Sequence, residues 1–299
     1  MNERGKSVDT TYLSLDAAEE RGFIHRDYIA HCLRWSHVIK RLAQSRAYAS
    51  AILLDVGCGR EMPLAKMLYS SRYIVEQYLG IDVGPIPDET ISVFDSGKFP
   101  VRAWESTDIC DLTSEDIGGC GANWLTCFEV LEHVEPEHML RMLAKFHELT
   151  TDDCKFFIST PCWNRIDCAN NHVNEMTYEA LGAVLESANF VVEHVYGTFA
   201  SIRDYEHLLG SPTSNEEPCT EKHLRDVFHE LRAYYDSNFL SCIFAPLFPA
   251  HSRNCLWELR KVRSDEQPTK MMPQILTFKP LFLCKEPWGS SVEWKKMKR

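Results

Sequence analysis

The stretch Leu53 to Glu61, LLDVGCGRE, joins an apolar run to a turn that contains two glycines. The run itself, AILLDV from Ala51 to Val56, is short, apolar and followed by turn residues, which predicts a buried strand of a parallel sheet. Gly57 and Gly59 have no Cβ, so a bound nucleotide can approach the backbone of this turn closely. The stretch therefore predicts a strand, a glycine turn and a helix that together bind a nucleotide-like ligand.

An acidic residue ends the next expected strand. This strand is YLGID, Tyr78 to Asp82. At the end of a parallel strand, the Asp82 carboxylate can accept hydrogen bonds from both hydroxyls of a ribose. A Gly-x-Gly turn alone occurs in many unrelated loops, and a structural turn followed by an unrelated acid is the alternative. The two features together predict a site for a ligand that contains ribose.

Strands and helices alternate along most of the chain, which predicts an α/β fold with a doubly wound, mostly parallel, Rossmann-like sheet. We expect strands at 51–56, 78–82, 99–104, 123–128, 155–160, 190–197 and 255–262, and helices at about 62–69, 137–149, 178–188 and 221–235. Residues 10–49 are expected to be largely helical, because five of them repeat at helical spacing: Tyr28, Cys32, Trp35, Ile39 and Leu42.

The same pattern divides the chain into five parts. We expect an N-terminal helical cap (1–50), a ligand-binding core (51–199), an insertion that covers the substrate (200–254), a last core strand (255–262) and a C-terminal tail (263–299). The insertion is expected to contain a loop at 211–218, and four prolines predict an irregular tail.

Composition limits the partners. The formal net charge is −11, and a protein that grips a phosphate backbone usually presents a basic face, so long duplex DNA is disfavoured. No apolar run reaches the roughly 18 residues that a membrane span requires, and the polar residues 1–9 do not form a signal peptide. The 12 cysteines form no Cys-x-x-Cys pair. We therefore expect a cytoplasmic protein without a membrane partner, disulfide framework or zinc site; no oligomeric state is specified.

The motifs resemble those of class I S-adenosylmethionine-dependent methyltransferases over roughly 52–195. Leu53–Glu61 resembles the first motif of this superfamily, and Gly80–Asp82 resembles the second. TCFEVLEHV, Thr126–Val134, is similar to the fourth-strand motif of the ubiquinone O-methyltransferase-like branch. The resemblance implies S-adenosylmethionine as cofactor and a set of residues that contact it: Asp55, Gly57, Cys58, Gly59, Asp82, Val83, Asp108, Ile109 and Phe128.

One residue departs from the family pattern. Glu61, preceded by Arg60, stands where the family usually has a third glycine, and it is expected to narrow the space near the methionine end of the cofactor. A non-catalytic module that binds S-adenosylmethionine is therefore an alternative to an enzyme. A dinucleotide oxidoreductase is a weaker alternative, because its Gly-x-Gly-x-x-Gly pattern requires glycine at Met62.

The EVLEHV segment offers three interpretations. Glu129, Glu132 and His133 stand at positions i, i+3 and i+4, so on a helical turn they would share one face. Histidine has an unperturbed pKa of about 6.5, which suits His133 as a catalytic general base. Alternatively, these three residues and His172 bind a divalent cation, an arrangement that resembles RNA 3′-terminal 2′-O-methyltransferases. The third interpretation is a purely structural helix start.

Together these patterns predict an S-adenosylmethionine-dependent methyltransferase that acts on an oxygen or nitrogen atom of a small molecule. His133 is the expected catalytic residue, and no metal is assigned. The two alternatives are a metal-assisted RNA 3′-terminal 2′-O-methyltransferase and the non-catalytic cofactor-binding module.

Overall fold

The computed structural model describes most of the predicted core. The described residues are 26–45, 48–71, 75–94, 99–163, 168–169, 171–200, 220–235, 237–263, 266 and 282–283. The expected helix before residue 26, the loop at 211–218 and most of the tail after 263 lie outside them.

A seven-stranded sheet forms the centre of the molecule, in the order β3-β2-β1-β4-β5-β8-β7. Its strands are β1 (Ile52–Val56), β2 (Gln77–Ile81), β3 (Val101–Trp104), β4 (Ala122–Phe128), β5 (Thr150–Pro161), β7 (Phe190–Phe199) and β8 (Asn254–Lys261). The first five are parallel, and β8 runs antiparallel to both β5 and β7. The predicted doubly wound, mostly parallel sheet is confirmed, and the carboxyl ends of its parallel strands meet at one edge.

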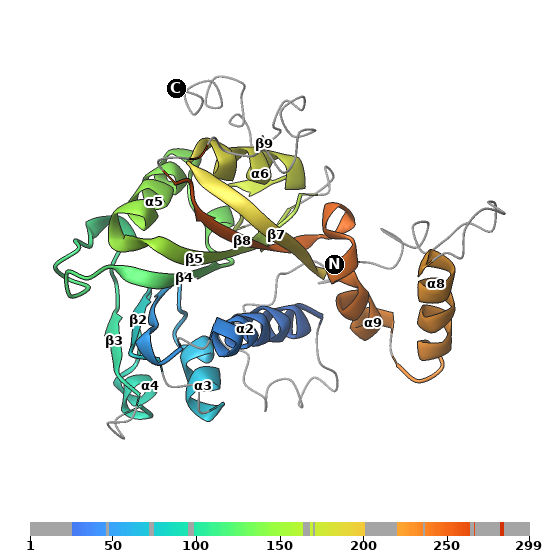
Figure 1. Ribbon diagram of the computed structural model, residues 1–299, viewed down its shortest axis with the longest axis horizontal. Helices are drawn as coiled ribbons and strands as arrows, with labels where there is room; N and C mark the ends of the chain where they lie inside the picture. Colours follow the sequence, from blue (N-terminus) through green and yellow to red (C-terminus); the bar gives the residue numbers. More distant parts are fainter. Residues whose placement is uncertain are drawn as a thin grey trace.

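Helices cover both faces of this sheet (Figure 1). The helices are α2 (Arg26–Ser45), α3 (Pro63–Ser70), α4 (Asp88–Ser92), α5 (Pro136–Leu149), α6 (Tyr178–Ser187), α8 (Thr220–Leu231) and α9 (Ser237–Phe244). Leu53, Trp124 and Phe157 alternate with Leu54, Leu125 and Phe156 along the strands, and the two sets belong to different core clusters. The first set packs with α2 and α3, and the second set packs with α5 and α6. This alternation buries the sheet on both sides.

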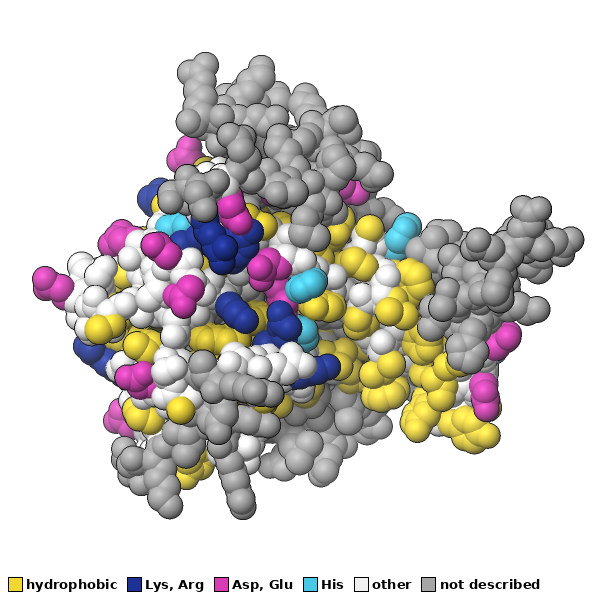
Figure 2. All heavy atoms as spheres, in the orientation of Figure 1, with side chains coloured by type: hydrophobic (Ala, Val, Ile, Leu, Met, Phe, Trp, Pro, Cys, Tyr) yellow, Lys and Arg dark blue, Asp and Glu magenta, His cyan; other side chains and the backbone are white. Residues whose placement is uncertain are grey.

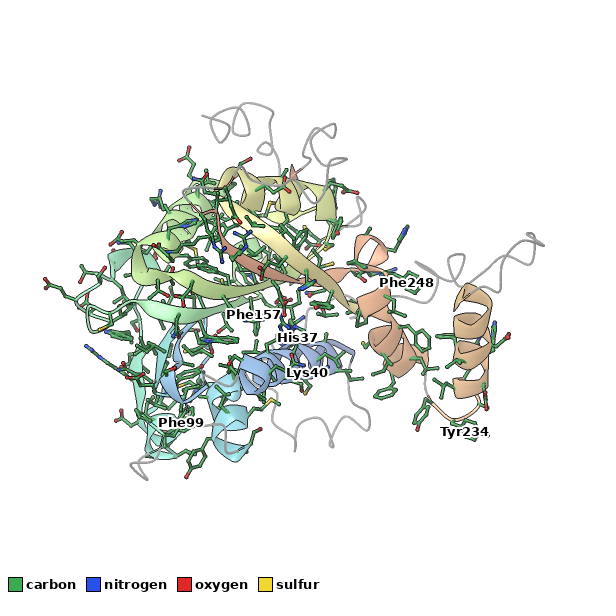
Figure 3. The ribbon with its side chains drawn as sticks, in the orientation of Figure 1. His37, Lys40, Phe99, Phe157, Tyr234 and Phe248 are labelled. Carbon is green, nitrogen blue, oxygen red and sulfur yellow. The ribbon has the colours of Figure 1, made fainter. Side chains whose placement is uncertain are left out.

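Helix α2 confirms the predicted N-terminal helix but not its predicted buried face. Ala30, Arg34, Val38 and Leu42 are buried, at i+4 spacing. Cys32 and Trp35, expected on the buried face, are only half-buried, whereas Ile39 and Leu42 are buried as expected. The side chain of Tyr28 lies outside the described part of the structure. Figure 3 shows His37 of α2 beneath Phe157 of β5, with ring centroids 6.2 Å apart. Compared with the predicted orientation, α2 is rotated about its axis, and the side chain of Arg34 lies in the protein interior.

The described part of the insertion forms a small core of its own beside β7. Its buried residues are Ala200, Phe228, Leu240, Phe244 and Ala245. Helix α9 also contacts α2 and β7. Both α4 and α9 were missed in the sequence, as was the short pair β6 (Glu175–Met176) and β9 (Phe282–Leu283). Within the described residues, none of the helices has the length and hydropathy needed to cross a bilayer.

Candidate functional site

The glycine turn after β1 is fastened to the end of β2. The amides of Gly57 and Cys58 both donate to the carbonyl oxygen of Ile81, at 2.8 and 3.1 Å. Gly57 and Gly59 have φ values of +71° and +72°, a region that glycine occupies without steric cost. A Cβ on Gly57 would lie 2.2 Å from Cγ2 of Val130, so the turn also needs glycine for space. The structure therefore places two glycines without a Cβ in the turn after β1, as the sequence predicts.

Asp82 connects the two strand ends. Its Oδ2 accepts from the amide of Gly59 at 2.9 Å, and its Oδ1 accepts from the amide of Gly84 at 2.7 Å. Each carboxylate oxygen can accept a second hydrogen bond, so the group is oriented by the backbone and retains capacity for a ligand. Asp82 therefore lies where the sequence predicts a ribose-binding acid.

Three residues predicted to contact the cofactor, Val83, Asp108 and Ile109, follow this acid in the chain. Val83 is 77% exposed, whereas Ile109 is buried. Asp108 caps a 3₁₀ turn by accepting from the amide of Cys110 at 2.9 Å, and its other oxygen lies 3.0 Å from Nε2 of His138. An exposed apolar residue and an oriented carboxylate suit the face and the edge of an adenine ring.

The side chain of Glu61, which is expected to narrow the space near the methionine end of the cofactor, contacts helix α3. Its carboxylate bonds to Nζ of Lys66 on α3, at 2.7 Å, and its side chain is about half exposed. The side chain of Cys58 is buried in the core below, so only the backbone of Cys58 faces the turn.

Asp55 is a buried support for the site. Its two oxygens accept from the hydroxyls of Tyr78 and Thr126, the latter at 2.6 Å. Burial raises the pKa of Asp55 to about 6, although both of these hydrogen bonds favour the ionised form. Because its oxygens are occupied by protein donors, Asp55 fixes β1 against its neighbours, and a direct contact with the cofactor stays a prediction.

The raised pKa of Asp55 predicts a pH-dependent stability. The protonated form is favoured in the folded state, so its contribution is fully present below pH about 4 and is lost as the pH rises through about 6. Relative to Asp55→Asn, the wild type should lose about 1.3 kcal/mol of unfolding free energy between pH 5 and pH 7. Urea unfolding of both proteins at the two pH values measures this difference. An equal gap at both pH values would rule out the titration.

Glu129 and His133 do not lie on one helical face, so this prediction was wrong. Glu129 has a φ of +57°, and only the three residues Leu131–His133 form a 3₁₀ helix. The left-handed residue turns the chain sharply between Glu129 and the 3₁₀ helix that carries Glu132 and His133.

Glu129 joins a polar cluster that the sequence did not reveal. Its carboxylate accepts from Oγ of Ser159 on β5 and from Nδ2 of Asn254 on β8, both at 2.8 Å. Arg34 of α2 is 1% exposed, and its NH1 donates to Thr198 Oγ1 at 3.2 Å and Asn254 Oδ1 at 3.0 Å. Burial would raise the pKa of Glu129, but Arg34 and these hydrogen bonds outweigh it and hold the pKa below its usual value. The carboxylate is therefore ionised.

Glu132, His133 and His172 form a second group, with one potential ligand atom from each lying within 4.8 Å of the others. Oε2 of Glu132 is buried without a hydrogen-bond partner, and burial, assisted by Glu129, raises the pKa of Glu132 well above its usual value. Nδ1 of His133 donates to the carbonyl of Asn171 at 3.2 Å. The His133 side chain is 38% exposed, so a ligand can reach it.

A family model described as a methyltransferase domain matches residues 25–195, which is more than half of the chain. This chain belongs to that methyltransferase family. The predicted methyltransferase, its class I fold and its cofactor S-adenosylmethionine are thereby confirmed. No curated protein sequence matches the chain significantly.

Three solved structures resemble this methyltransferase. The small RNA methyltransferase HEN1 has a TM-score of 0.50 and 19% identity, over 80% of this chain and 26% of that chain. A Burkholderia thailandensis 1,6-didemethyltoxoflavin-N1-methyltransferase, solved with bound 1,6-didemethyltoxoflavin and S-adenosylhomocysteine, has a TM-score of 0.49 and 14% identity, over 83% and 85% of the two chains. Magnesium protoporphyrin IX methyltransferase from Synechocystis PCC 6803 has a TM-score of 0.46 and 13% identity, over 79% and 85%. At these identities the likeness concerns the fold.

Basic side chains gather on another face of this methyltransferase (Figure 2). They lie around a hollow of about 600 Å³ lined by Arg41, Lys155, Val191, Val192, Glu193, His194 and Arg260. Arg41 pairs with Glu258 at 3.0 Å, and Arg260 pairs with Glu193 at 3.3 Å. Two of the three cations that line the hollow are therefore paired with acids, so the hollow is a mixed-charge surface. It contains no predicted site residue.

Proposed function

We propose that this methyltransferase transfers the methyl group of S-adenosylmethionine to an oxygen or nitrogen atom of a small molecule. The observation that supports this most is the polar cluster of Arg34, Glu129 and Asn254, which lies beside the glycine turn. Such a cluster offers a few oriented polar groups to a compact acceptor. The net charge of −11 and the mixed charge of the basic surface also disfavour a polyanionic acceptor.

In this proposal the cofactor contacts follow the strand ends. Asp82 binds the ribose, Val83 and Ile109 contact the adenine ring, and Asp108 accepts from the adenine edge. The backbone of residues 57–59 and the end of β4 at Phe128 lie along the remaining part of the cofactor. S-adenosylmethionine supplies an activated methyl group on its sulfonium.

The chain's own contribution is to orient the acceptor and to take up its proton. Holding the two reactants in line supplies a large part of the acceleration of such a transfer. His133, which is partly exposed at the end of β4, acts as the general base. The cap and the insertion enclose the acceptor: Arg34 belongs to the cap, while Thr198 and Asn254 flank the insertion on either side.

The substrate class can be tested with methyl-labelled S-adenosylmethionine. The protein is incubated in separate reactions with an ultrafiltered small-molecule extract of the source cells and with total RNA from the same cells. We expect label in the small-molecule reaction. Label in RNA alone would replace this proposal with the metal-assisted candidate, and label in neither reaction would contradict both.

A second candidate, metal-assisted methyl transfer to RNA termini, is favoured by the Glu132, His133 and His172 group. Nδ1 of His172 bonds to Oε2 of Glu175 at 2.7 Å, a carboxylate–histidine contact that commonly orients a metal-binding imidazole. The buried, unpartnered oxygen of Glu132 is also suited to a cation. These residues would hold a divalent ion that polarises the attacking hydroxyl. Glu129 is not part of this group of three, because its carboxylate accepts hydrogen bonds from Ser159 and Asn254 instead.

A further inference from the structure

Glu129 is held in a backbone conformation that is costly for a residue with a side chain. Its φ of +57° lies in the left-handed region, and residues of this kind concentrate at functional sites. Its amide donates to the carbonyl oxygen of Ser159 at 2.9 Å, which fixes the turn onto the end of β5. From this turn the carboxylate reaches β5 and β8, where it accepts hydrogen bonds from Ser159 and Asn254.

The carboxylate of Glu129 has spare hydrogen-bonding capacity. Ser159 donates to Oε1 and Asn254 donates to Oε2, whereas a carboxylate can accept about four hydrogen bonds. The side chain is 21% exposed, so it is not sealed within the protein. A ligand group with a hydrogen to donate can therefore reach it.

Arg34 balances the negative charge of Glu129 without donating a hydrogen bond to its carboxylate. Its NH1 lies 3.7 Å from Oε1 of Glu129, beyond hydrogen-bond distance, and donates to Thr198 and Asn254 instead. Burial and then Arg34 lower the pKa of His31 to about 3, so this neighbouring imidazole is neutral. The cluster has almost no net charge, which favours a neutral hydrogen-bond donor over a cation.

Glu129 lies beside the glycine turn in the structure. Its chain neighbour Val130 lies so close to Gly57 that a Cβ there would be only 2.2 Å from Cγ2 of Val130. Its other neighbour, Phe128, ends β4. The carboxylate therefore lies at the junction between the glycine turn and the end of β5.

We propose that Glu129 binds the methyl acceptor by accepting a hydrogen bond from a neutral O–H or N–H group of that molecule, and that Arg34, Ser159 and Asn254 position its carboxylate for this contact. This inference rests on the proposed transfer to a small molecule. The competing explanation is that Glu129 only neutralises the buried Arg34.

A charge relocation separates the two explanations. In the double variant Glu129→Gln with Asn254→Asp, the carboxylate moves to β8, where Asp at 254 still accepts from Arg34 and Thr198. The amide of Gln at 129 donates to it, which reverses the original hydrogen bond, and still accepts from Ser159. The net charge and the number of hydrogen bonds are retained, so the double variant should be more stable than either single variant.

Three quantities are measured for the wild type, both single variants and the double variant: the melting temperature, the calorimetric affinity for S-adenosylmethionine, and label transfer to the small-molecule extract. We expect the double variant to recover the wild-type melting temperature and cofactor affinity, while its transfer rate stays about ten- to a hundredfold lower. Transfer within twofold of the wild type would overturn the inference. No transfer by the wild type would instead overturn the proposed function.

If the double variant does not fold, Glu129→Asp provides the test. This variant keeps the negative charge, but its side chain is one methylene group shorter, so the carboxylate oxygens lie closer to the backbone. Normal cofactor affinity with reduced transfer is expected, and wild-type transfer would overturn the inference.

Discussion

Replacing His133 with alanine is expected to lower turnover by about 10²–10⁴, while the affinity for S-adenosylmethionine stays near that of the wild type. The imidazole lies beyond the end of β4 and is partly exposed, so an acceptor can reach it. Turnover is measured as label transfer at saturating cofactor, and affinity is measured by calorimetry. His194→Ala, which removes an exposed imidazole on β7, serves as the control and should leave both quantities unchanged.

The same assay distinguishes a base from a metal ligand. If His133 is a ligand, a chelator abolishes transfer and added magnesium or manganese restores it, while Glu132→Ala and His172→Ala are as damaging as His133→Ala. If His133 is the base, the chelator has no effect. Full turnover in all three variants, with no effect of the chelator, would show that the group is structural.

Replacing Asp82 with alanine is expected to weaken S-adenosylmethionine binding about ten- to a hundredfold. The ribose hydroxyls would lose a charged acceptor, and hydrogen bonds to charged groups contribute about 1.5–3 kcal/mol. The amides of Gly59 and Gly84 would lose their acceptor as well. Calorimetry on the folded variant measures the change, with Glu89→Ala as an exposed carboxylate control on the neighbouring helix α4. Unchanged affinity for the Asp82 variant would contradict the ribose assignment.

The glycine turn and its contact with Asp82 could be predicted because they are built from local sequence. A short apolar strand, two glycines and an acid after the next strand specify the backbone that carries them, and the structure places Gly59 and Asp82 in direct contact. Parallel strands bring such turns to one sheet edge whatever the intervening sequence. The strand positions were predictable for the same reason, with differences of a few residues at their ends.

The polar cluster of Arg34, Glu129 and Asn254 could not be predicted, because it joins residues that are distant in the chain. Arg34 and Asn254 are 220 positions apart and meet only because β8 inserts antiparallel beside β5. The sequence offered one signal that Arg34 is buried: it stands four residues from Ala30 and four from Val38, which lie on the buried face of α2. The i, i+3, i+4 spacing also predicted the wrong neighbours for Glu129. That spacing applies only to residues with helical φ values, and Glu129 has a left-handed φ.

A crystal structure with S-adenosylhomocysteine bound tests the central claim most directly. We predict that both ribose hydroxyls lie within hydrogen-bond distance of the Asp82 carboxylate, that the adenine ring contacts Val83 and Ile109, and that the sulfur lies on the side of the site where Glu129 is found. A ligand bound elsewhere at saturating concentration, or a ribose without contact to Asp82, would contradict this account of the site.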